Sequence, residues 1–338
     1  MGKLSLVSGA FAALALATMP ALGATLDDVK TRGNLKCGVD GGLPGFSAPN
    51  DAGAMTGIDA DVCYALAAAI FGDKSKVEFT NLTATERFTA LSSGEIDVLA
   101  RNTTQTLTRD ATLGINFTYY NYIDGQGFLA KNALGVKSAK ELSGATVCVQ
   151  AGTTTELNLA DYFRANNMQF TPVVYDTSVQ TREGFDGGSC DVLTSDKSQL
   201  AAIRTELKDP SGATILPETI SKEPLGPAVR QGDDQWANIV RWTLFALINA
   251  DELGVSSANV DEKNASSEDP NVKRLLGTED TMGAHLGLSN DWALNAIKAV
   301  GNYDEMYERN IAPLGLERAN SVNALWNNGG VLYAPPVR

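Results

Sequence analysis

Hydrophobic positions in the first third of the chain recur every four residues in one segment and alternate with polar residues in another, at 95–100. Ile58, Val62, Leu66 and Ile70 recur every four residues, and this period predicts an amphipathic helix that ends at Gly72. The elements expected around this helix are strands at 35–39, 76–82 and 95–100, and a second helix from Thr85, its expected N-cap, to Gly94. A β-α-β-α-β order is typical of a mostly parallel sheet with helical crossovers.

The same order of elements returns in the middle of the chain. Strands are expected at 145–150, 170–175 and 190–196, with helices at 151–167 and 178–188 between them. From residue 233 onward the pattern is largely helical, and these helices are expected to cover the sheet of the first unit. The sequence therefore predicts an α/β fold of two lobes, and the length of 338 residues agrees with two domains.

The first residues have a different composition. A single cation, Lys3, precedes a long alanine-rich apolar run that ends in small residues. This pattern is typical of a cleaved signal peptide, with cleavage expected after Gly23 or, as the alternative, after Ala24. A membrane anchor is the other interpretation, but the run is short for a bilayer span. We therefore expect an exported protein.

Charge narrows the classes of partner. The formal net charge is −13, and loss of Lys3 with the signal peptide makes it −13 − 1 = −14. A strongly acidic protein lacks the basic face that nucleic-acid binding needs, and anionic lipid does not attract it. The global charge does not determine the ligand, because a local cleft can have the opposite sign.

Four cysteines and one histidine limit the chemistry further. An even number of cysteines, Cys37, Cys63, Cys148 and Cys190, fits two disulfides in an exported chain, with four buried thiols as the alternative. Their spacing does not resemble a zinc motif, and His285 has no neighbouring nucleophile motif. The glycine-rich fingerprints of nucleotide sites do not occur in the required form. We therefore expect no metal and no cofactor.

Polar residues follow the expected strands, at the edge where an open α/β sheet binds ligands. Arg109, a few residues after one such strand, can bind a carboxylate through two hydrogen bonds, and amides at helix starts can assist it. Asp196 can hold a cation, supported by the carbonyl of Asn102. The residues at the ends of the four strands, or just after them, are Asp40, Gly41, Gly42 and Leu43; Arg101, Asn102, Thr103 and Thr104; Gly152, Thr153 and Thr154; and Ser195 and Asp196.

A cation site and an anion site on facing lobes match a zwitterion, and free α-amino acids are zwitterions. Burial of such a ligand costs free energy unless both charges are paired. Each residue alone also has an ordinary structural interpretation, with the threonines and Asp196 as helix caps and Arg109 as a surface ion-pair residue. The combination at four strand ends favours the binding site.

Several segments resemble the periplasmic amino-acid-binding proteins of ABC transporters (solute-binding protein family 3), most closely the general, polar L-amino-acid branch. They extend from about Leu35 to Arg338, and they are CGVDGGLPGFSAP, TGIDADVCYALAAAIFGD, RFTALSSGEIDVLARNTTQTLTRD, GATVCVQAGTTTELNLADYFRAN, CDVLTSD and the ending LYAPPVR. The resemblance implies that Arg109 binds the ligand's carboxylate. The other residues that we expect in the site are Asn102, Thr104, Thr154 and Asp196 at the head group, Gln150 and Ser195 at the side chain, and Asp40 and Leu43 after the first strand, where Leu43 replaces a covering aromatic.

The resemblance also implies a type II periplasmic-binding-protein fold with two hinge crossovers, near 121–128 and 220–227. The expected parts are the signal peptide (1–23), lobe I (24–124 and 225–338) and lobe II (125–224). The implied disulfides, Cys37–Cys63 and Cys148–Cys190, each lie within one lobe and leave the hinge free.

The implied function is that of a periplasmic, monomeric protein that closes on a free L-amino acid and docks on the membrane permease of an ABC transporter. Gln150 and Ser195 favour ligands with polar or acidic side chains. The alternative is an exported dehydratase-like enzyme on the same scaffold. Such an enzyme needs an acid or base in the cleft, and Asp40, Glu86 and Lys197 are the candidates.

Overall fold

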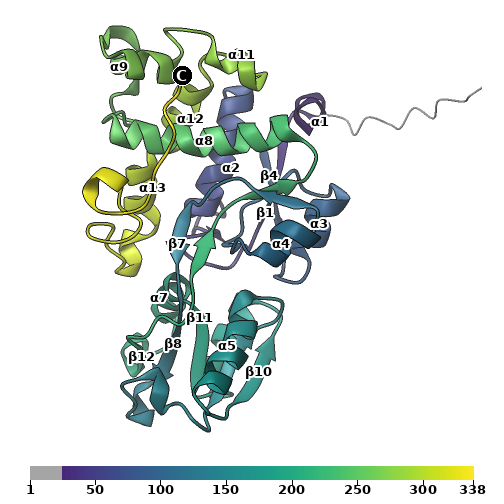
Figure 1. The fold of residues 1–338 in the computed structure, drawn as a ribbon, viewed down its shortest axis with the longest axis vertical. Coiled ribbons are helices and arrows are strands. Elements are labelled where there is room, and N and C mark those ends of the chain that lie inside the picture. Colours follow the sequence, from purple (N-terminus) through teal and green to yellow (C-terminus); the bar gives the residue numbers. More distant parts are fainter. Residues whose placement is uncertain (1–24) are drawn as a thin grey trace, which may run out of the picture.

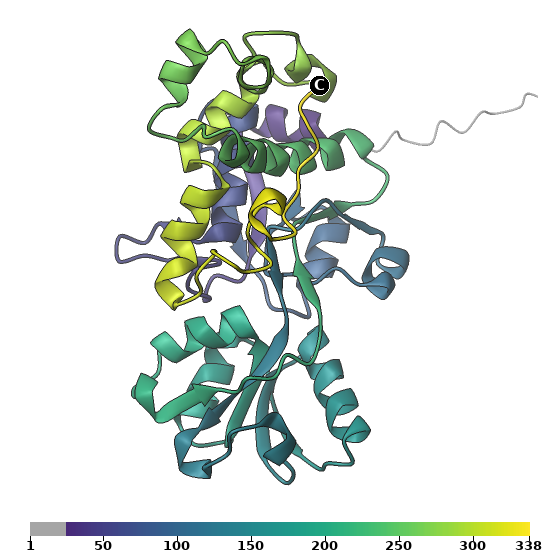
Figure 2. The same cartoon turned by 60° about the vertical axis from the view of Figure 1, so that its left-hand side comes forward.

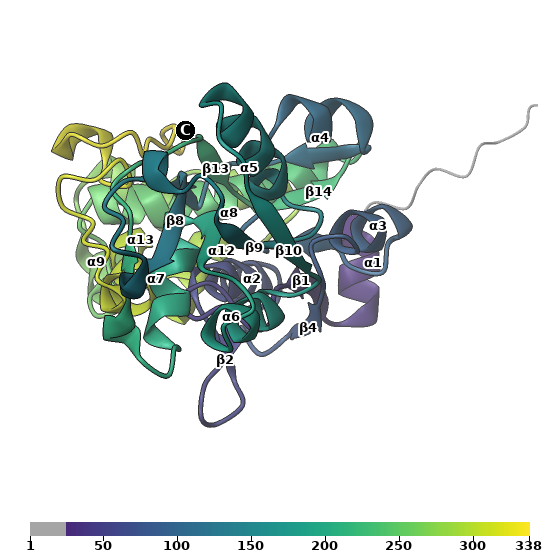
Figure 3. The same cartoon turned by 90° about the horizontal axis from the view of Figure 1, so that it is seen from below.

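The structure, a computed structural model, describes residues 25–338, and the expected signal peptide lies outside the described residues. Two lobes are stacked along the long axis of the molecule (Figure 1, Figure 2). Lobe I, the upper lobe in Figure 1, contains both ends of the described chain, and lobe II is formed by the middle of the chain. Figure 3, seen from below, shows lobe II in front of lobe I.

The sheet of lobe I has five strands in the order β4-β1-β5-β14-β6. β1 pairs in parallel with β4 and β5, whereas β14 pairs antiparallel with β5 and β6. Four strands of this sheet therefore run in one direction, and β14 is reversed. The strands are β1 (Leu35–Val39), β4 (Val77–Asn81), β5 (Val98–Leu99), β6 (Ile115–Phe117) and β14 (Ala228–Arg230).

The sheet of lobe II repeats this plan in the order β10-β9-β11-β8-β12. β9 pairs in parallel with β10 and β11, and β8 pairs antiparallel with β11 and β12. In both sheets the reversed strand is the one that follows a crossover between the lobes. The strands are β8 (Gln126–Lys131), β9 (Thr146–Gln150), β10 (Thr171–Tyr175), β11 (Val192–Asp196) and β12 (Ala213–Ile215).

Two short strands connect the lobes. β7 (Tyr122–Asp124) and β13 (Glu223–Leu225) form an antiparallel pair, and β7 lies between the lobes in Figure 1. The expected lobe boundaries after residues 124 and 224 fall at these strands and stay predictions. A small hairpin of β2 (Ala48–Pro49) and β3 (Met55–Thr56) projects from lobe I.

Helices cover both sheets. In lobe II they are α5 (Thr154–Ala165), α6 (Ser178–Asp186) and α7 (Lys197–Thr205). In lobe I they are α1 (Thr25–Arg32), α2 (Ile58–Phe71), α3 (Arg87–Ser93), α4 (Leu107–Thr112), α8 (Asp234–Glu252), α9 (Val260–Ser266), α10 (Pro270–Leu276), α11 (Met282–Leu286), α12 (Trp292–Val300) and α13 (Tyr303–Asn310). The helices after residue 233 pack on lobe I, as the sequence predicts.

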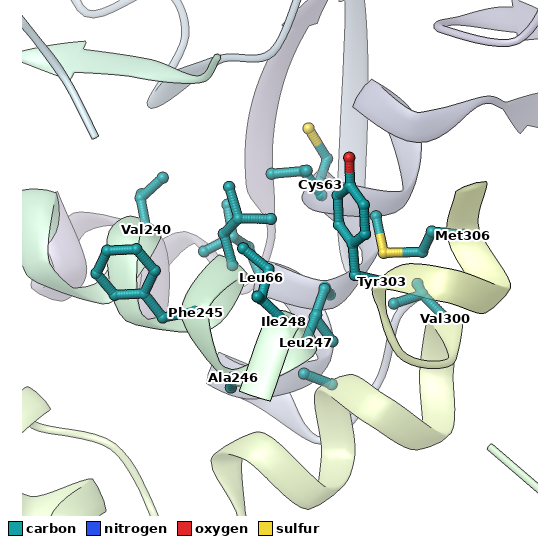
Figure 4. Close-up of a cluster of buried hydrophobic side chains, with 14 of the residues drawn as sticks. Cys63, Leu66, Val240, Phe245, Ala246, Leu247, Ile248, Val300, Tyr303 and Met306 are labelled. Carbon is teal, nitrogen blue, oxygen red and sulfur yellow. The ribbon is translucent and has the colours of Figure 1, made fainter. Parts of the chain in front are cut away.

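The core of lobe I lies around α2. Leu66 of α2, Ile248 of α8 and Tyr303 of α13 are fully buried in one cluster (Figure 4). Each such side chain contributes about 1.5–3 kcal/mol by its removal from water. The prediction that α2 is amphipathic is wrong, because α8 and α12 cover the side that would otherwise face water, and even its Asp59 and Asp61 are buried.

Two local predictions also need correction. Thr85 is not the N-cap of α3, because Glu86 precedes the first helical residue and its N–H donates to Thr83 Oγ1 at 3.2 Å. The strand expected at 95–100 is only Val98–Leu99, because the N–H of Asp97 and of Ala100 bond to β1 outside the regular ladder. Gly94 ends α3 in the left-handed conformation, as expected.

Both implied disulfides are present. Cys37 of β1 is joined to Cys63 of α2, and Cys148 of β9 is joined to Cys190 before β11. Each bridge lies within one lobe, so neither opposes movement of the lobes. Among residues 25–338 no helix is long and apolar enough to span a membrane.

Candidate functional site

A small cavity lies where the two lobes meet. The residues that line it from lobe I are Arg87, Arg101, Asn102 and Thr104, and those from lobe II are Gln150, Thr153, Thr154, Thr155, Ser195, Asp196 and Gln199. Six of the nine expected ligand contacts are in this set, namely Asn102, Thr104, Gln150, Thr154, Ser195 and Asp196. Arg109, Asp40 and Leu43 are not.

The lobes touch directly around the cavity. Asn102 Nδ2 of lobe I donates to Gln199 Oε1 of lobe II at 3.2 Å, and Ser178 Oγ of lobe II donates to Asp40 Oδ1 at 2.8 Å. Gly152, with a φ of 71°, lies so close to lobe I that a Cβ there would be 2.7 Å from Thr85 Cγ2. The structure therefore describes a closed form of the protein.

Asp196 supplies the negative charge of the cavity. It ends β11 and is 4% exposed, and its Oδ1 is buried without a hydrogen-bond partner. Burial and the neighbouring carboxylates of Asp124 and Glu223 raise the pKa of Asp196 well above its usual value, and Arg87 and Arg109 offset part of this. Asp196 occupies the N-cap position of α7, but its side chain makes no capping hydrogen bond there, so capping does not account for its buried carboxyl group. A cation placed here would pair with it.

Asn102 is held in an unusual conformation at the end of β5. Its φ is 29°, in the region that non-glycine residues rarely adopt. Its N–H donates to the buried Oδ2 of Asp59 at 2.6 Å, and this bond fixes the turn that carries Thr104. Such a conformation costs on the order of 1–3 kcal/mol, and it persists where surrounding contacts enforce it.

Arg109 lies beside the cavity. Its Nη1 donates to the carbonyl of Thr104 at 2.7 Å, and its guanidinium lies over the Phe88 ring, 5.1 Å from the ring centre. Burial lowers the pKa of Arg109 to about 10, although the charges of Glu223 and Asp196 oppose this shift. The guanidinium group remains a cation at neutral pH. It contacts the cavity through Thr104, which lines the cavity and whose carbonyl it binds.

Two arginines that the sequence analysis did not assign as ligand contacts line the cavity. Arg87 of α3 donates from Nη1 to Thr103 Oγ1 at 3.1 Å, and its buried Nε has no partner. Burial and the nearby Arg109 and Arg101 lower the pKa of Arg87, but an arginine keeps its charge at neutral pH. Nothing in the local pattern of α3 signals this role, because only the packing of the lobes brings Arg87 to the cavity.

Arg101 does stand at a strand end, so position alone could have identified it. Its Nη2 is paired with Asp40, and its Nε donates to the carbonyl of Leu82 at 2.8 Å. Asp40 is therefore already bonded to Arg101 and Ser178, and it does not line the cavity. Leu43 is 1% exposed in the core of lobe I and makes no wall of the cavity.

Gln150 and Ser195 line the part of the cavity formed by lobe II. Both are buried, and Gln150 Nε2 donates to the carbonyl of Asp176 at 3.0 Å. This bond leaves the carbonyl oxygen of the amide available to a ligand. In the described part of the chain, no group of three or more His, Cys, Asp or Glu side chains is arranged to hold a metal ion.

Two α/β lobes that meet over a cavity with buried charges of both signs define a solute-binding protein that holds its ligand between the lobes. The chain belongs to the bacterial extracellular solute-binding proteins, family 3, whose family model matches residues 35–258.

Close relatives extend over the whole chain. The general L-amino acid-binding periplasmic protein AapJ of Rhizobium johnstonii is 57% identical over 99% of this chain and 100% of its own. The glutamate/glutamine/aspartate/asparagine-binding protein BztA of Rhodobacter capsulatus is 51% identical, with the same coverage. A periplasmic binding protein of an ABC transporter from Brucella ovis, solved with glutathione bound, is 54% identical and superposes with a TM-score of 0.90 over 93% of this chain and 99% of that chain.

Proposed function

We propose that this protein captures free L-amino acids with polar or acidic side chains between its lobes and delivers them to the permease of an ABC transporter. One observation carries the proposal. Asp196 Oδ1 and Arg87 Nε are buried, belong to opposite charges on opposite lobes, line one cavity and have no hydrogen-bond partner. Buried polar atoms without partners are costly, so they are retained where a ligand completes their hydrogen bonds, and a ligand's ammonium group would also stabilise the ionised form of Asp196.

The ligand's ammonium group would lie against Asp196 and the carbonyl of Asn102. Its α-carboxylate would take the place beside Arg109, as the family resemblance implies, once the lobes open to admit it. Gln150 and Ser195 would face the side chain, and Arg87 adds a cation that favours a second acidic or polar group on the ligand.

The names of the relatives agree with this class of ligand. AapJ is named for general L-amino acids and BztA for four amino acids with acidic or amide side chains. The Brucella protein holds glutathione, whose γ-glutamyl end carries a free α-amino and α-carboxyl group, so a longer ligand with the same head group belongs in the test.

Export to the periplasm, a monomeric state and bending at the β7 and β13 strands complete the proposal. It is tested by isothermal titration calorimetry of unfolded, ligand-stripped and refolded protein against the twenty L-amino acids, glutathione and D-glutamate. We expect saturable 1:1 binding of polar or acidic L-amino acids. A protein that binds none of these compounds would contradict the proposal.

The dehydratase-like alternative lacks a free acid or base among its three candidates. Asp40 is paired with Arg101, Glu86 is bonded to Thr83, and Lys197 Nζ donates to the carbonyl of Pro217 at 2.8 Å. None of the three is among the described residues that line the cavity. Incubation with labelled amino acids should return them unchanged, and any turnover would favour the enzyme.

A further inference from the structure

A buried carboxylate of the second crossover joins both lobes. Glu223 of β13 is 1% exposed, and in the hinge pair it lies opposite Asp124 of β7. Its Oε2 accepts hydrogen bonds from Thr104 Oγ1 at 2.6 Å and from Thr154 Oγ1 at 2.9 Å. Its Oε1 accepts from Asn158 Nδ2 at 2.8 Å and from Ser221 Oγ at 2.5 Å. Four donors therefore satisfy this one group.

These donors come from three parts of the molecule that move relative to each other when a hinge opens. Thr104 follows β5 in lobe I, Thr154 and Asn158 belong to α5 in lobe II, and Ser221 is in the crossover itself. Opening of the cleft about the paired strands β7 and β13 separates Thr104 from α5. One carboxylate cannot stay bonded to both Thr104 and α5 once they separate. The complete set of bonds therefore exists only in the closed form.

The same bonds determine what the cavity offers to a ligand. Thr104 and Thr154 line the cavity, whereas Glu223 lies behind them and does not. A threonine hydroxyl has a single proton, and both protons are directed to Glu223 Oε2. The hydroxyls therefore present only lone pairs to the cavity. Lone pairs accept hydrogen bonds from an ammonium group and repel a carboxylate.

We propose that Glu223 is a positioning residue that couples closure of the lobes to recognition of the ligand's ammonium group. It bridges lobe I and lobe II in the closed form, and it holds the hydroxyls of Thr104 and Thr154 as acceptors. The part that concerns the ligand rests on the proposed function, whereas the closure part rests on the contacts alone.

Glu223→Gln is the direct test, because the amide keeps the size of the side chain but has one acceptor oxygen and two N–H donors. If its NH2 faces the threonines, their hydroxyls turn and direct protons into the cavity. If it faces Asn158 and Ser221, its NH2 meets the NH2 of Asn158, and only the Ser221 hydroxyl can turn to accept a hydrogen bond. Asn158→Ala removes one lobe II donor outside the cavity, and it decides the closure question even if Glu223→Gln does not fold.

The matched control is Glu218→Gln. Glu218 precedes the same crossover and also accepts two hydrogen bonds, from Ser138 Oγ and from the N–H of Ala139 at 3.0 Å. Both donors belong to lobe II, so this carboxylate does not bridge the lobes. Its replacement tests whether the loss of any hydrogen-bonded carboxylate of this segment has the same effect.

Small-angle X-ray scattering of ligand-free protein measures closure, and calorimetry with L-glutamate measures affinity. We expect Glu223→Gln to increase the radius of gyration and to raise the Kd at least tenfold. Asn158→Ala should show a smaller change in the same direction, and Glu218→Gln should match the unaltered protein. If Glu223→Gln and Asn158→Ala both match Glu218→Gln, the role in closure is wrong.

A double-mutant cycle separates orientation of the hydroxyls from closure. In a Thr154→Val background, Glu223→Gln should raise the Kd at least threefold less than it does alone, because one oriented hydroxyl is already gone. Additive effects would overturn the orientation of the hydroxyls. If the unaltered protein binds no amino acid while Glu223→Gln still opens the lobes, the proposed function and the ammonium role fail, and the role in closure stands.

Discussion

The N–H of Asn102 and the carboxylate of Asp59 form a 2.6 Å hydrogen bond beneath the ligand cavity. The other oxygen of Asp59 accepts from Asn121 Nδ2, also at 2.6 Å, just before the first hinge strand. A single buried carboxylate thus supports both the turn that faces the ligand and the start of the crossover. Its charge has a cost, because burial raises the pKa of Asp59 to about 6.

The first prediction is a pH dependence of stability. Between its ordinary value of 3.8 and about 6, Asp59 binds its proton more tightly in the folded than in the unfolded protein, so stability falls as pH rises through this window. The pKa of Asp124, also raised to about 6, acts in the same direction, while the lowered pKa values of Asp73 and Glu305 act below their ordinary values of 3.8 and 4.5, so they contribute little between pH 5 and pH 7.5. We expect the Tm of ligand-free protein to be higher at pH 5 than at pH 7.5.

Asp59→Asn should reduce this difference and still fold, because Asn121 Oδ1 is buried without a partner and can accept from the new amide once the Asn121 amide turns. Thermal unfolding followed by circular dichroism at both pH values checks the prediction. A Tm difference that is unchanged in Asp59→Asn would show that other groups produce the pH dependence.

The second prediction concerns proton release at Asp196. The pKa of this carboxyl is raised in the ligand-free cavity, and an ammonium group favours its ionised form, so binding should release protons and affinity should fall as pH falls. Calorimetry in buffers of different ionisation enthalpy measures the release. Asp196→Asn should abolish it and should weaken amino acids more than plain carboxylic acids. Equal apparent enthalpies in every buffer would argue against the role.

The third prediction is that Arg109→Ala abolishes measurable amino-acid binding. Truncation of one partner of a buried, hydrogen-bonded charge pair costs about 2–5 kcal/mol or more, which is at least about 30-fold in Kd. Arg164→Ala in α5 is the control, since the Arg164 side chain is 79% exposed and does not line the cavity. Calorimetry compares the amino-acid affinity of the two variants. An unchanged affinity in Arg109→Ala would show that Arg109 is not part of the site.

The fourth prediction assigns specificity to Arg87. Replacement by methionine removes the cation with the unpartnered Nε. The Kd for glutamate should therefore rise more than the Kd for glutamine. The ratio of the two Kd values is the relevant measurement, because Arg87 also bonds to Thr103 and any distortion there would weaken both ligands together. A constant ratio would place the ligand's side chain elsewhere.

The fifth prediction concerns the disulfide of lobe II. Cys148 and Cys190 are 42 residues apart, and closure of a loop of this length in the unfolded chain stabilises the native state by roughly 4 kcal/mol. The double serine variant should lose about this free energy of unfolding in urea, with ligand affinity little changed, because the bridge does not line the cavity. A large loss of affinity in the folded variant would contradict this separation.

Much of the fold could be predicted from local patterns. The positions of α2, β1 and β9 could be predicted because backbone hydrogen bonding and the spacing of apolar residues depend on neighbours in the sequence, whereas burial of the second face of α2 could not. Residues at strand ends, such as Asp196, could also be identified, because parallel strands bring their carboxyl ends to one edge.

What only the tertiary structure decided is the set of partners across the lobes. Arg87 lies on a helix, and Glu223 lies on the second crossover between the lobes. The spacing of hydrophobic and polar residues around them does not indicate a function. Thr104 and Glu223 are 119 residues apart, and their bond exists because the hinge pair brings them together. Sequence determined where each backbone element forms, since that depends on short-range interactions. Closure of one lobe on the other determined which charges share the cavity, since that depends on contacts that no short segment contains.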